Sequence, residues 1–214
     1  MTRFFSLIIA VVLFSCSDRA EKPSVPEKDS TEVMSEAFQF NAEFPELYQY
    51  LSSQDSTFDP QGFDQGELTV QKNNWQDGFE PARLQEYLPY LIFNADSTYA
   101  LDLVTYNYAP RKKGDSVVFE VQGPDFEVGL IDWKNRRRKR LLFFGPSGPM
   151  ITDARWKDST TALLAGIREW PANDSLRPLV LKYDVANESW EQFEYPSHIR
   201  AEWKSYAERL PKHR

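Results

Sequence analysis

The hydrophobic period of the chain changes to two between Asp96 and Tyr195, and this change limits the fold more than any other feature. Apolar and polar residues alternate there in short runs, which is the pattern of half-buried strands. Compact turns rich in Gly, Pro, Asn and Asp separate the runs. Short strands joined by tight turns predict an antiparallel meander of about eight strands. The predicted strands are residues 99–106, 117–121, 127–133, 138–144, 150–156, 161–167, 178–184 and 189–195.

Helical patterns flank this meander on both sides. Residues 31–95 are predicted to be helix and loop, with one short helix at residues 44–51 and another from Pro81 to about Leu91. Residues 197–214 predict a C-terminal helix that Ser197 caps. The predicted fold class is therefore α+β: a single globular domain over residues 31–214, mainly antiparallel β over residues 96–196, with short helices at its two ends.

A short turn motif occurs twice in the predicted meander. Residues 132–135 (DWKN) and 184–187 (DVAN) share an Asp-x-x-Asn pattern at the end of an apolar strand, and Asp and Asn suit such turns because their side chains bond local backbone. The roughly 100 residues around them resemble two blades of a β-propeller, at about 50 residues a blade. Since closed propellers have at least four blades, the resemblance implies a pair of four-stranded sheets. Assembly of a ring from two or more chains is the alternative.

The N-terminal residues are typical of a targeting signal. Residues 1–15 combine Arg3 with a short apolar run, about half the length of a membrane-spanning helix, which is typical of a secretory signal peptide. The segment Leu13-Phe14-Ser15-Cys16 resembles the lipobox of bacterial lipoproteins, and Cys16 is the only Cys in the chain. The resemblance implies cleavage before Cys16 and acylation of its sulfur and amino group, which together hold a protein stably on a bilayer. A buried Cys in a membrane helix is the alternative.

The residues after Cys16 favour a tethered envelope protein. Residues 17–30 are polar, charged and contain Pro, so they predict a flexible tether with no core of its own. Ser17 after the Cys resembles sorting to the outer membrane, and Asp18 and Glu21 resemble the acidic tags of some surface lipoproteins. We therefore expect a lipid anchor in a Gram-negative outer membrane, on its periplasmic or its outer face.

Charge and composition exclude several classes of function. Lys plus Arg total 25 against 32 Asp plus Glu, a net charge of -7, whereas nucleic-acid-binding domains usually carry a basic balance. One Cys and two His leave no Cys-rich metal site and few groups for acid–base chemistry. No metal and no cofactor are predicted. The predicted function is a non-catalytic binding or assembly module with the bilayer and an envelope protein as partners. A glycan-binding accessory lipoprotein and a hydrolase with a carboxylate pair are the alternatives.

The basic run at residues 135–140 (NRRRKR) is unusual in an acidic chain. Arg136, Arg137 and Arg138 are candidates for binding a phosphate-bearing headgroup or an acidic glycan, because guanidinium groups bind such anions through paired hydrogen bonds. The simpler interpretation is a solvated hairpin whose cations discourage edge pairing.

Two of the six Trp residues are candidates for stacking on a sugar ring. Trp75 and Trp170 lie in predicted loops beside amide, carboxylate or Pro residues, and loop aromatics are more often available to ligands than strand aromatics. The simpler interpretation is packing, because large aromatic side chains are mostly buried.

Overall fold

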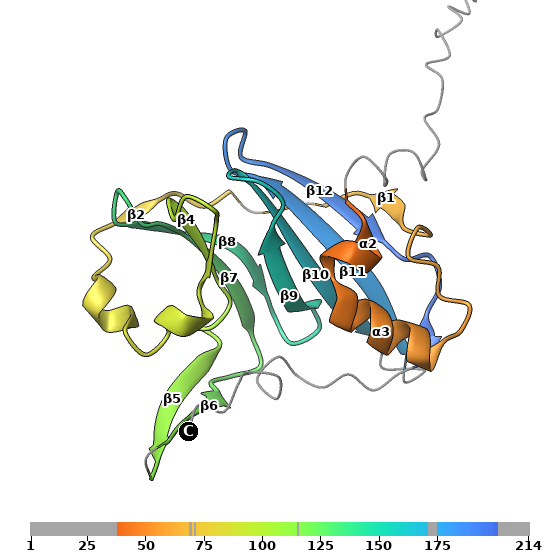
Figure 1. Ribbon diagram of the computed structural model, residues 1–214, viewed down its shortest axis with the longest axis horizontal. Coiled ribbons are helices and arrows are strands. Elements are labelled where there is room, and N and C mark those ends of the chain that lie inside the picture. Colours follow the sequence, from red (N-terminus) through yellow and green to blue (C-terminus); the bar gives the residue numbers. More distant parts are fainter. Residues whose placement is uncertain (1–37, 69, 71, 115, 171–174, 201–214) are drawn as a thin grey trace, which may run out of the picture.

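The structure is a computed structural model that describes residues 38–68, 70, 72–114, 116–170 and 175–200. The predicted signal peptide, Cys16 and the predicted tether lie outside the described residues, as do residues 201–214. The described chain forms two antiparallel sheets that pack on each other, with a separate two-stranded hairpin extending beyond them (Figure 1).

The strands of each sheet follow one another closely along the chain. The first sheet contains, in order, β1 (Asp64–Gly66), β12 (Ser189–Glu194), β11 (Ser175–Asp184), β10 (Thr161–Trp170) and β9 (Met150–Trp156), and β13 (Ile199–Arg200) pairs with the start of β11. The second sheet contains β2 (Gln76–Asp77), β8 (Arg137–Phe144), β7 (Phe126–Asp132), β4 (Tyr99–Asp102) and β3 (Ile92–Phe93). The hairpin of β5 (Tyr108–Lys113) and β6 (Ser116–Val121) lies between β4 and β7 in sequence.

The predicted antiparallel β architecture is confirmed, since every strand pairing in the described chain is antiparallel. Each predicted strand overlaps an observed one, but the predicted number of about eight was too low. The long strand predicted over residues 99–106 ends at Asp102, and β5 was missed. Pro110 and the three cations that follow it in β5 hide the alternation there, because Pro breaks a strand pattern. Four short strands, β1, β2, β3 and β13, have no periodic pattern to reveal them.

The helix predictions have mixed outcomes. The helix at residues 44–51 is confirmed as α3 (Pro45–Gln54), which follows the short α2 (Phe40–Glu43). The helix predicted from Pro81 to about Leu91 is wrong: two 3-10 turns, η1 (Pro81–Leu84) and η2 (Leu88–Tyr90), stand in its place. Pro89 lies inside the second turn and removes a backbone donor, which interrupts an α-helix.

The predicted C-terminal helix also needs correction at its start. Residues 199–200 form β13 on the edge of β11, where the pattern predicted helix. The rest of that prediction, residues 201–214, lies outside the described residues. Ile199 is fully buried in the core beside α3, so burial against the sheet fixes this segment as strand.

Both sheets bury side chains on both of their faces. Along β10, Ala162 and Leu164 join the apolar cluster between the two sheets, while Leu163 and Ala165 point to the opposite face. That outer face is covered by α2, α3 and a group of aromatic rings, and Figure 1 shows the two helices lying across this sheet. The outer face of the second sheet is covered by the chain around η1 and η2. Since both outer faces are covered by the chain itself, neither needs a further sheet against it.

The two Asp-x-x-Asn turns have the same hydrogen bonds. In the turn between β7 and β8, Asp132 accepts bonds from the Asn135 backbone N–H at 3.0 Å and from its side-chain amide at 2.8 Å. In the turn between β11 and β12, Asp184 accepts the same two bonds from Asn187, at 3.1 and 2.7 Å. The next residue has a positive φ in both turns, 52° at Arg136 and 50° at Glu188. The matching sequence motifs therefore specify one turn geometry in both sheets.

The turns that precede β4 and β10 also match. Residues 96–101 (DSTYAL) and 158–163 (DSTTAL) share five of six positions, and in each turn the Asp carboxylate accepts a bond from the backbone N–H of the Thr. The carbonyl of Thr98 then accepts a bond from the N–H of Trp133, and that of Thr160 from Val185, both at 2.9 Å. Each sheet thus links its two turns in the same way.

We expect Asp132→Ala to lower the free energy of unfolding by about 2 kcal/mol, because it removes hydrogen bonds to a buried, charged side chain. Asp184→Ala, in the more exposed turn, serves as the matched comparison and should cost about 1 kcal/mol. Urea unfolding of both variants at pH 7 makes the measurement. Equal costs for the two variants would contradict the expectation.

The cost of Asp132→Ala should also depend on pH. Burial alone would raise the pKa of Asp132, but hydrogen bonds from Arg137 and Asn135 outweigh it and hold the pKa below its usual value. A lowered pKa stabilises the folded state above the unfolded value, about 3.9, and this contribution disappears as the pH falls through the folded pKa. Asp132→Ala should therefore lower the free energy of unfolding by less at pH 3 than at pH 7. A greater loss of stability at pH 3 would contradict a lowered pKa for Asp132.

Candidate functional site

The basic run lies at the turn between β7 and β8 and in the first half of β8. Arg136 is exposed at the turn. Arg137 donates to the buried Asp132 at 2.6 Å, so this guanidinium neutralises a carboxylate of its own hairpin. Arg138 enters the sheet and lies between two further carboxylates. The run is therefore largely paired with acids of the same domain.

Arg138 joins two buried acids on the outer face of the second sheet. Its guanidinium lies 3.1 Å from Asp102 and 2.7 Å from Glu127, and the side chains of these acids are 0% and 1% exposed. The Arg138 pKa is raised: burial opposes this, but the charges of Asp102 and Glu127 outweigh burial. Thr105 and two backbone N–H groups complete the bonds to Asp102, and Arg140 donates to Glu127 at 2.6 Å.

A glycine makes room for this arrangement. A Cβ at Gly129 would lie 2.7 Å from Nη2 of Arg138, so a side chain there would displace the guanidinium from its acids. Gly129 pairs with Asp102 in β4, directly beneath the ion cluster. Gly129, Arg138, Asp102 and Glu127 thus form one structural unit that sequence spacing did not reveal, because its members come from three strands.

Trp75 is packed against the domain. Its partly buried ring packs against the cluster between the sheets, and the Arg137 guanidinium and the Lys139 ammonium lie 4.9 and 5.7 Å from its ring centre. Lys139 also donates to Glu188 at 2.7 Å, and this bond is the main reason that the Glu188 pKa is lowered, with a smaller contribution from a Trp75 hydrogen bond. Trp75 therefore connects the segment before β2 to β8 and to the turn before β12.

A cavity of about 210 Å³ adjoins this group. Its wall includes Tyr183 and Trp190, whose rings pack at 4.5 Å between centroids. Burial raises the pKa of Tyr183 to about 12, so its hydroxyl stays protonated at physiological pH. Lys139 and Glu188 on the same wall already pair with each other, so the charges of this small cavity are largely satisfied.

The expectation that Trp170 lies in a loop is wrong. Trp170 is the last residue of β10 and pairs with Ser175 at the start of β11. The position of its side chain lies outside what the structure describes. The Pro that follows Trp170 marks the end of the strand, which is where Pro is tolerated in a sheet.

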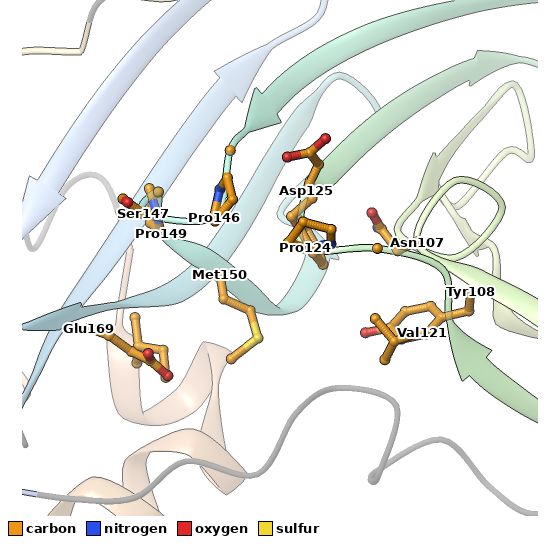
Figure 2. Close-up of a pocket in the computed structure, with 15 residues that line it drawn as sticks. Asn107, Tyr108, Val121, Pro124, Asp125, Pro146, Ser147, Pro149, Met150 and Glu169 are labelled. Atoms are coloured by element: carbon orange, nitrogen blue, oxygen red, sulfur yellow. The ribbon is translucent and has the colours of Figure 1, made fainter. Parts of the chain in front are cut away.

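A large cavity lies where the chain crosses from the second sheet to the first. It has a volume of about 290 Å³ and is bordered by the loops 123–125 and 145–149, by the base of the hairpin and by the end of β10. Figure 2 shows Met150 in the middle of the lining residues, with Asp125 and Pro124 on one side and Glu169 on the other. The pairing of Phe126 with Phe144 brings the two loops together, because one loop ends where β7 begins and the other starts where β8 ends.

The lining of this cavity is mainly apolar and its loops are stiff. Three prolines, in Gly-Pro steps or beside them, fix the backbone of both loops, since the ring of Pro locks φ. Ser147, Asp125 and Glu169 are the polar side chains at the rim, while Asn107 deeper in is committed to backbone partners in residues 103 and 127. The apolar side chains of the lining belong to Tyr108, Val121, Pro124, Phe126, Pro146, Pro149, Met150 and Ile167.

One exposed apolar side chain of the domain lines this cavity. In the described part of the chain, the large hydrophobic residues that are exposed are Tyr106, Val121 and Phe143. Val121 lines the cavity, whereas Phe143 and Arg140 line a separate cavity of about 130 Å³. The rings of Tyr106 and Phe143 meet edge to face at 5.9 Å, and the Arg140 guanidinium lies 4.7 Å from the centre of the Phe143 ring. Since Val121 is 59% exposed, the apolar lining of the first cavity reaches the surface.

The sequence predicts the two Gly-Pro loops only as turns. Knowledge that β7 pairs with β8 would have placed the two loops side by side, because both loops adjoin the same end of that hairpin. The crossing to β9 adds the third wall. A cavity built from loops of separate strands has no local motif, so its residues carried no pattern of their own.

The described residues give no sign of metal chemistry or of a membrane-spanning helix. In the part of the chain that the structure describes, no group of three or more His, Cys, Asp or Glu residues is placed to hold a metal ion. Within the same residues, no helix has the length and apolarity needed to cross a bilayer. Comparisons of the chain with models of known protein families, with curated proteins and with solved structures found no match.

We expect Arg138→Met to lower the free energy of unfolding by about 3 kcal/mol at pH 7, because two buried carboxylates lose the cation between them. Arg111→Met is the matched control: its ion pair with Glu120 is exposed, with side chains 70% and 54% accessible, and such pairs contribute well under about 1 kcal/mol. Urea unfolding of both variants makes the comparison. A cost for Arg138→Met no greater than that of the control would show that Asp102 and Glu127 do not depend on this cation.

Proposed function

We propose that this protein is a lipid-anchored lipoprotein of the bacterial outer membrane whose domain is a non-catalytic binding module. The lipobox-like segment that ends at Cys16 and the polar stretch of residues 17–30 support the anchor and the tether. The described domain begins at Phe38, within about ten residues of the end of this predicted tether. A tether of this length would hold the domain close to the bilayer.

The binding site of this module is the 290 Å³ cavity at the crossing between the sheets. The observation that carries this proposal is a mainly apolar cavity whose lining includes the exposed side chain of Val121 and the polar side chains of Asp125 and Glu169. A concave apolar site with a few polar groups at its rim is the usual form of a ligand site. The stiff Gly-Pro loops keep the site formed before a ligand arrives, which reduces the entropic cost of binding.

The geometry favours binding over hydrolysis. A glycoside hydrolase needs two carboxylates that face one substrate, one of them with a raised pKa. Asp102 and Glu127 are buried together, but Arg138 lies between them and pairs with both. Asp125 and Glu169 line the cavity, but Glu169 is exposed to water.

The glycan-binding alternative is less favoured. It depends on flat aromatic faces open to a sugar, and the partly buried ring of Trp75 packs against the cluster between the sheets with two cations beside it. The strand position of Trp170 makes it less suited to a loop platform. The large cavity does not need either residue.

We also propose that the two sheets are two copies of one blade-like repeat. The strands β3, β4, β7 and β8 would correspond to β9, β10, β11 and β12, which have the same order in their sheet. The matched turns at Asp96 and Asp158, and at Asp132 and Asp184, support this correspondence. Coverage of both outer faces by other segments explains how two such repeats would be stable without a closed ring.

The anchor can be tested by labelling cells with an alkyne analogue of palmitate. We expect the wild-type protein to take up the label and to lose residues 1–15, and Cys16→Ala to remain unlabelled and uncleaved. Ser17→Ala, which leaves the acceptor thiol in place, is the control and should be labelled as wild type. Equal labelling of Cys16→Ala and the wild type would refute the anchor.

The binding site can be tested with a photocrosslinking amino acid at Val121, which lines the cavity and is 59% exposed. We expect irradiation in living cells to give an adduct, of any size, that intact mass spectrometry detects. Gly123→Trp should abolish that adduct, because a Cβ at Gly123 meets no atom within 4 Å and the new ring can fill the cavity without distorting the backbone.

Two controls make the result decisive. The same crosslinker at Gln49, exposed on α3 away from the cavity, should give no adduct that responds to Gly123→Trp. Lys112→Trp on the hairpin adds the same ring at a distant exposed position and should leave the Val121 adduct unchanged. If no adduct forms at Val121, or if Gly123→Trp does not change it, the cavity is not the binding site.

A further inference from the structure

The acids at the large cavity differ from the buried acids of the domain. Asp102, Asp132 and Glu127 are each paired with an Arg, and Glu188 and Glu194 are paired with Lys139, Arg168 and Arg177. Within the described residues, by contrast, no hydrogen bond or ion pair joins Asp125 or Glu169 to another side chain, as is also true of the exposed acids Asp64 and Glu67. Asp125 and Glu169 are distinguished from those surface acids by their place in the lining of an apolar cavity.

The two cavity acids lie on different sides of this apolar cavity. In Figure 2, Asp125 and Glu169 lie on opposite sides of Met150. None of the described residues that line the cavity is Lys, Arg or His. The lining therefore supplies two negative charges and no positive one. A positively charged ligand would complement it, and a negatively charged ligand would be repelled.

The surroundings of the cavity indicate a ligand larger than the cavity itself. A volume of about 290 Å³ is at the lower end of the range for small-molecule sites, which is room for one or two side chains. Val121 lines the cavity and is 59% exposed, so the apolar lining continues to the surface. A side chain that fills the cavity would therefore leave its flanking residues against an apolar surface, which favours a polypeptide over a small amine.

We propose, on the basis of the binding function proposed above, that the cavity receives a Lys or Arg side chain from a polypeptide segment whose neighbouring residues are apolar. The aliphatic part of that side chain would pack on Met150 and Ile167, as long cationic side chains do on apolar surfaces. Its charge would lie between Asp125 and Glu169. The flanking apolar residues would rest on Val121 at the surface.

The test uses the full mature protein in detergent and fluorescein-labelled pentapeptides. The central residue is Lys, norleucine or Glu, and the two flanking positions take every combination of Leu, Phe and Pro. Norleucine keeps most of the aliphatic chain of Lys and lacks its charge. For at least one flanking combination, we expect the Lys peptide to bind about fivefold more tightly than its norleucine counterpart in fluorescence anisotropy, the effect of two partly exposed charge pairs. The Glu peptide should be the weakest.

Matched variants assign the preference to the two acids. The double variant Asp125→Asn with Glu169→Gln should bind the Lys and norleucine peptides equally, and raised salt should have the same effect in the wild type. Glu86→Gln, at an exposed acid that is not part of the cavity lining, should keep the fivefold preference. Gly123→Trp should abolish binding of all the peptides.

Each other outcome overturns the proposal in a way that separates it from the proposed function. If norleucine or Glu peptides bind as tightly as Lys peptides and Gly123→Trp abolishes that binding, the cavity is a binding site without a preference for cations. Phenethylammonium is tested beside the peptides as a small amine. If it binds and no peptide does, the ligand is a small amine and the proposal of a polypeptide ligand is refuted. If nothing binds, the charge proposal fails, and the crosslinking experiment at Val121 decides the binding function independently.

Discussion

The apolar seam between the two sheets is the interaction on which the rest of the structure depends. Side chains from β4, β7 and β8 meet side chains from β9, β10 and β11 there in one continuous buried cluster. Each sheet by itself would expose this face to water, and a sheet of a few short strands is only marginally stable alone. The seam therefore fixes how the sheets face each other, and with it the position of every loop that joins them.

The large cavity is a consequence of that seam. The chain passes from β8 to β9 through the loop 145–149, and this crossing cannot fill the end of the seam because its residues are Gly, Pro and Ser. Gly148 shows how tight the loop is, since a Cβ there would lie 2.6 Å from the Cβ of Phe144. The loop therefore packs closely against the end of β8, and the cavity lies beside it.

The short apolar runs bounded by turns were enough to predict the four long strands β9 to β12 of the first sheet to within three residues at each end, but not its short strands β1 and β13. The turns at Asp132 and Asp184 were also predictable, since their Asp and Asn side chains act locally. The segment at η1 and η2 was not, because its apolar stripe fits a helix while Pro89 forbids one. The ion pairs of Arg137 and Arg138 were beyond local patterns, since their partners come from other strands or from across a turn.

The position of the cavity follows from the place where the two sheets differ. Between β10 and β11 only residues 171–174 intervene, whereas residues 103–125 separate β4 from β7 and include the β5–β6 hairpin. The cavity is lined by both parts of that insertion, at Asn107 and Tyr108 and at Val121 and residues 123–125. The turns and the contact between the sheets gain nothing in stability from an open cavity that has two unpaired acids in its lining. Departures from a consistent framework are expected at functional sites, and in this domain the insertion, the cavity and the acids Asp125 and Glu169 are found together.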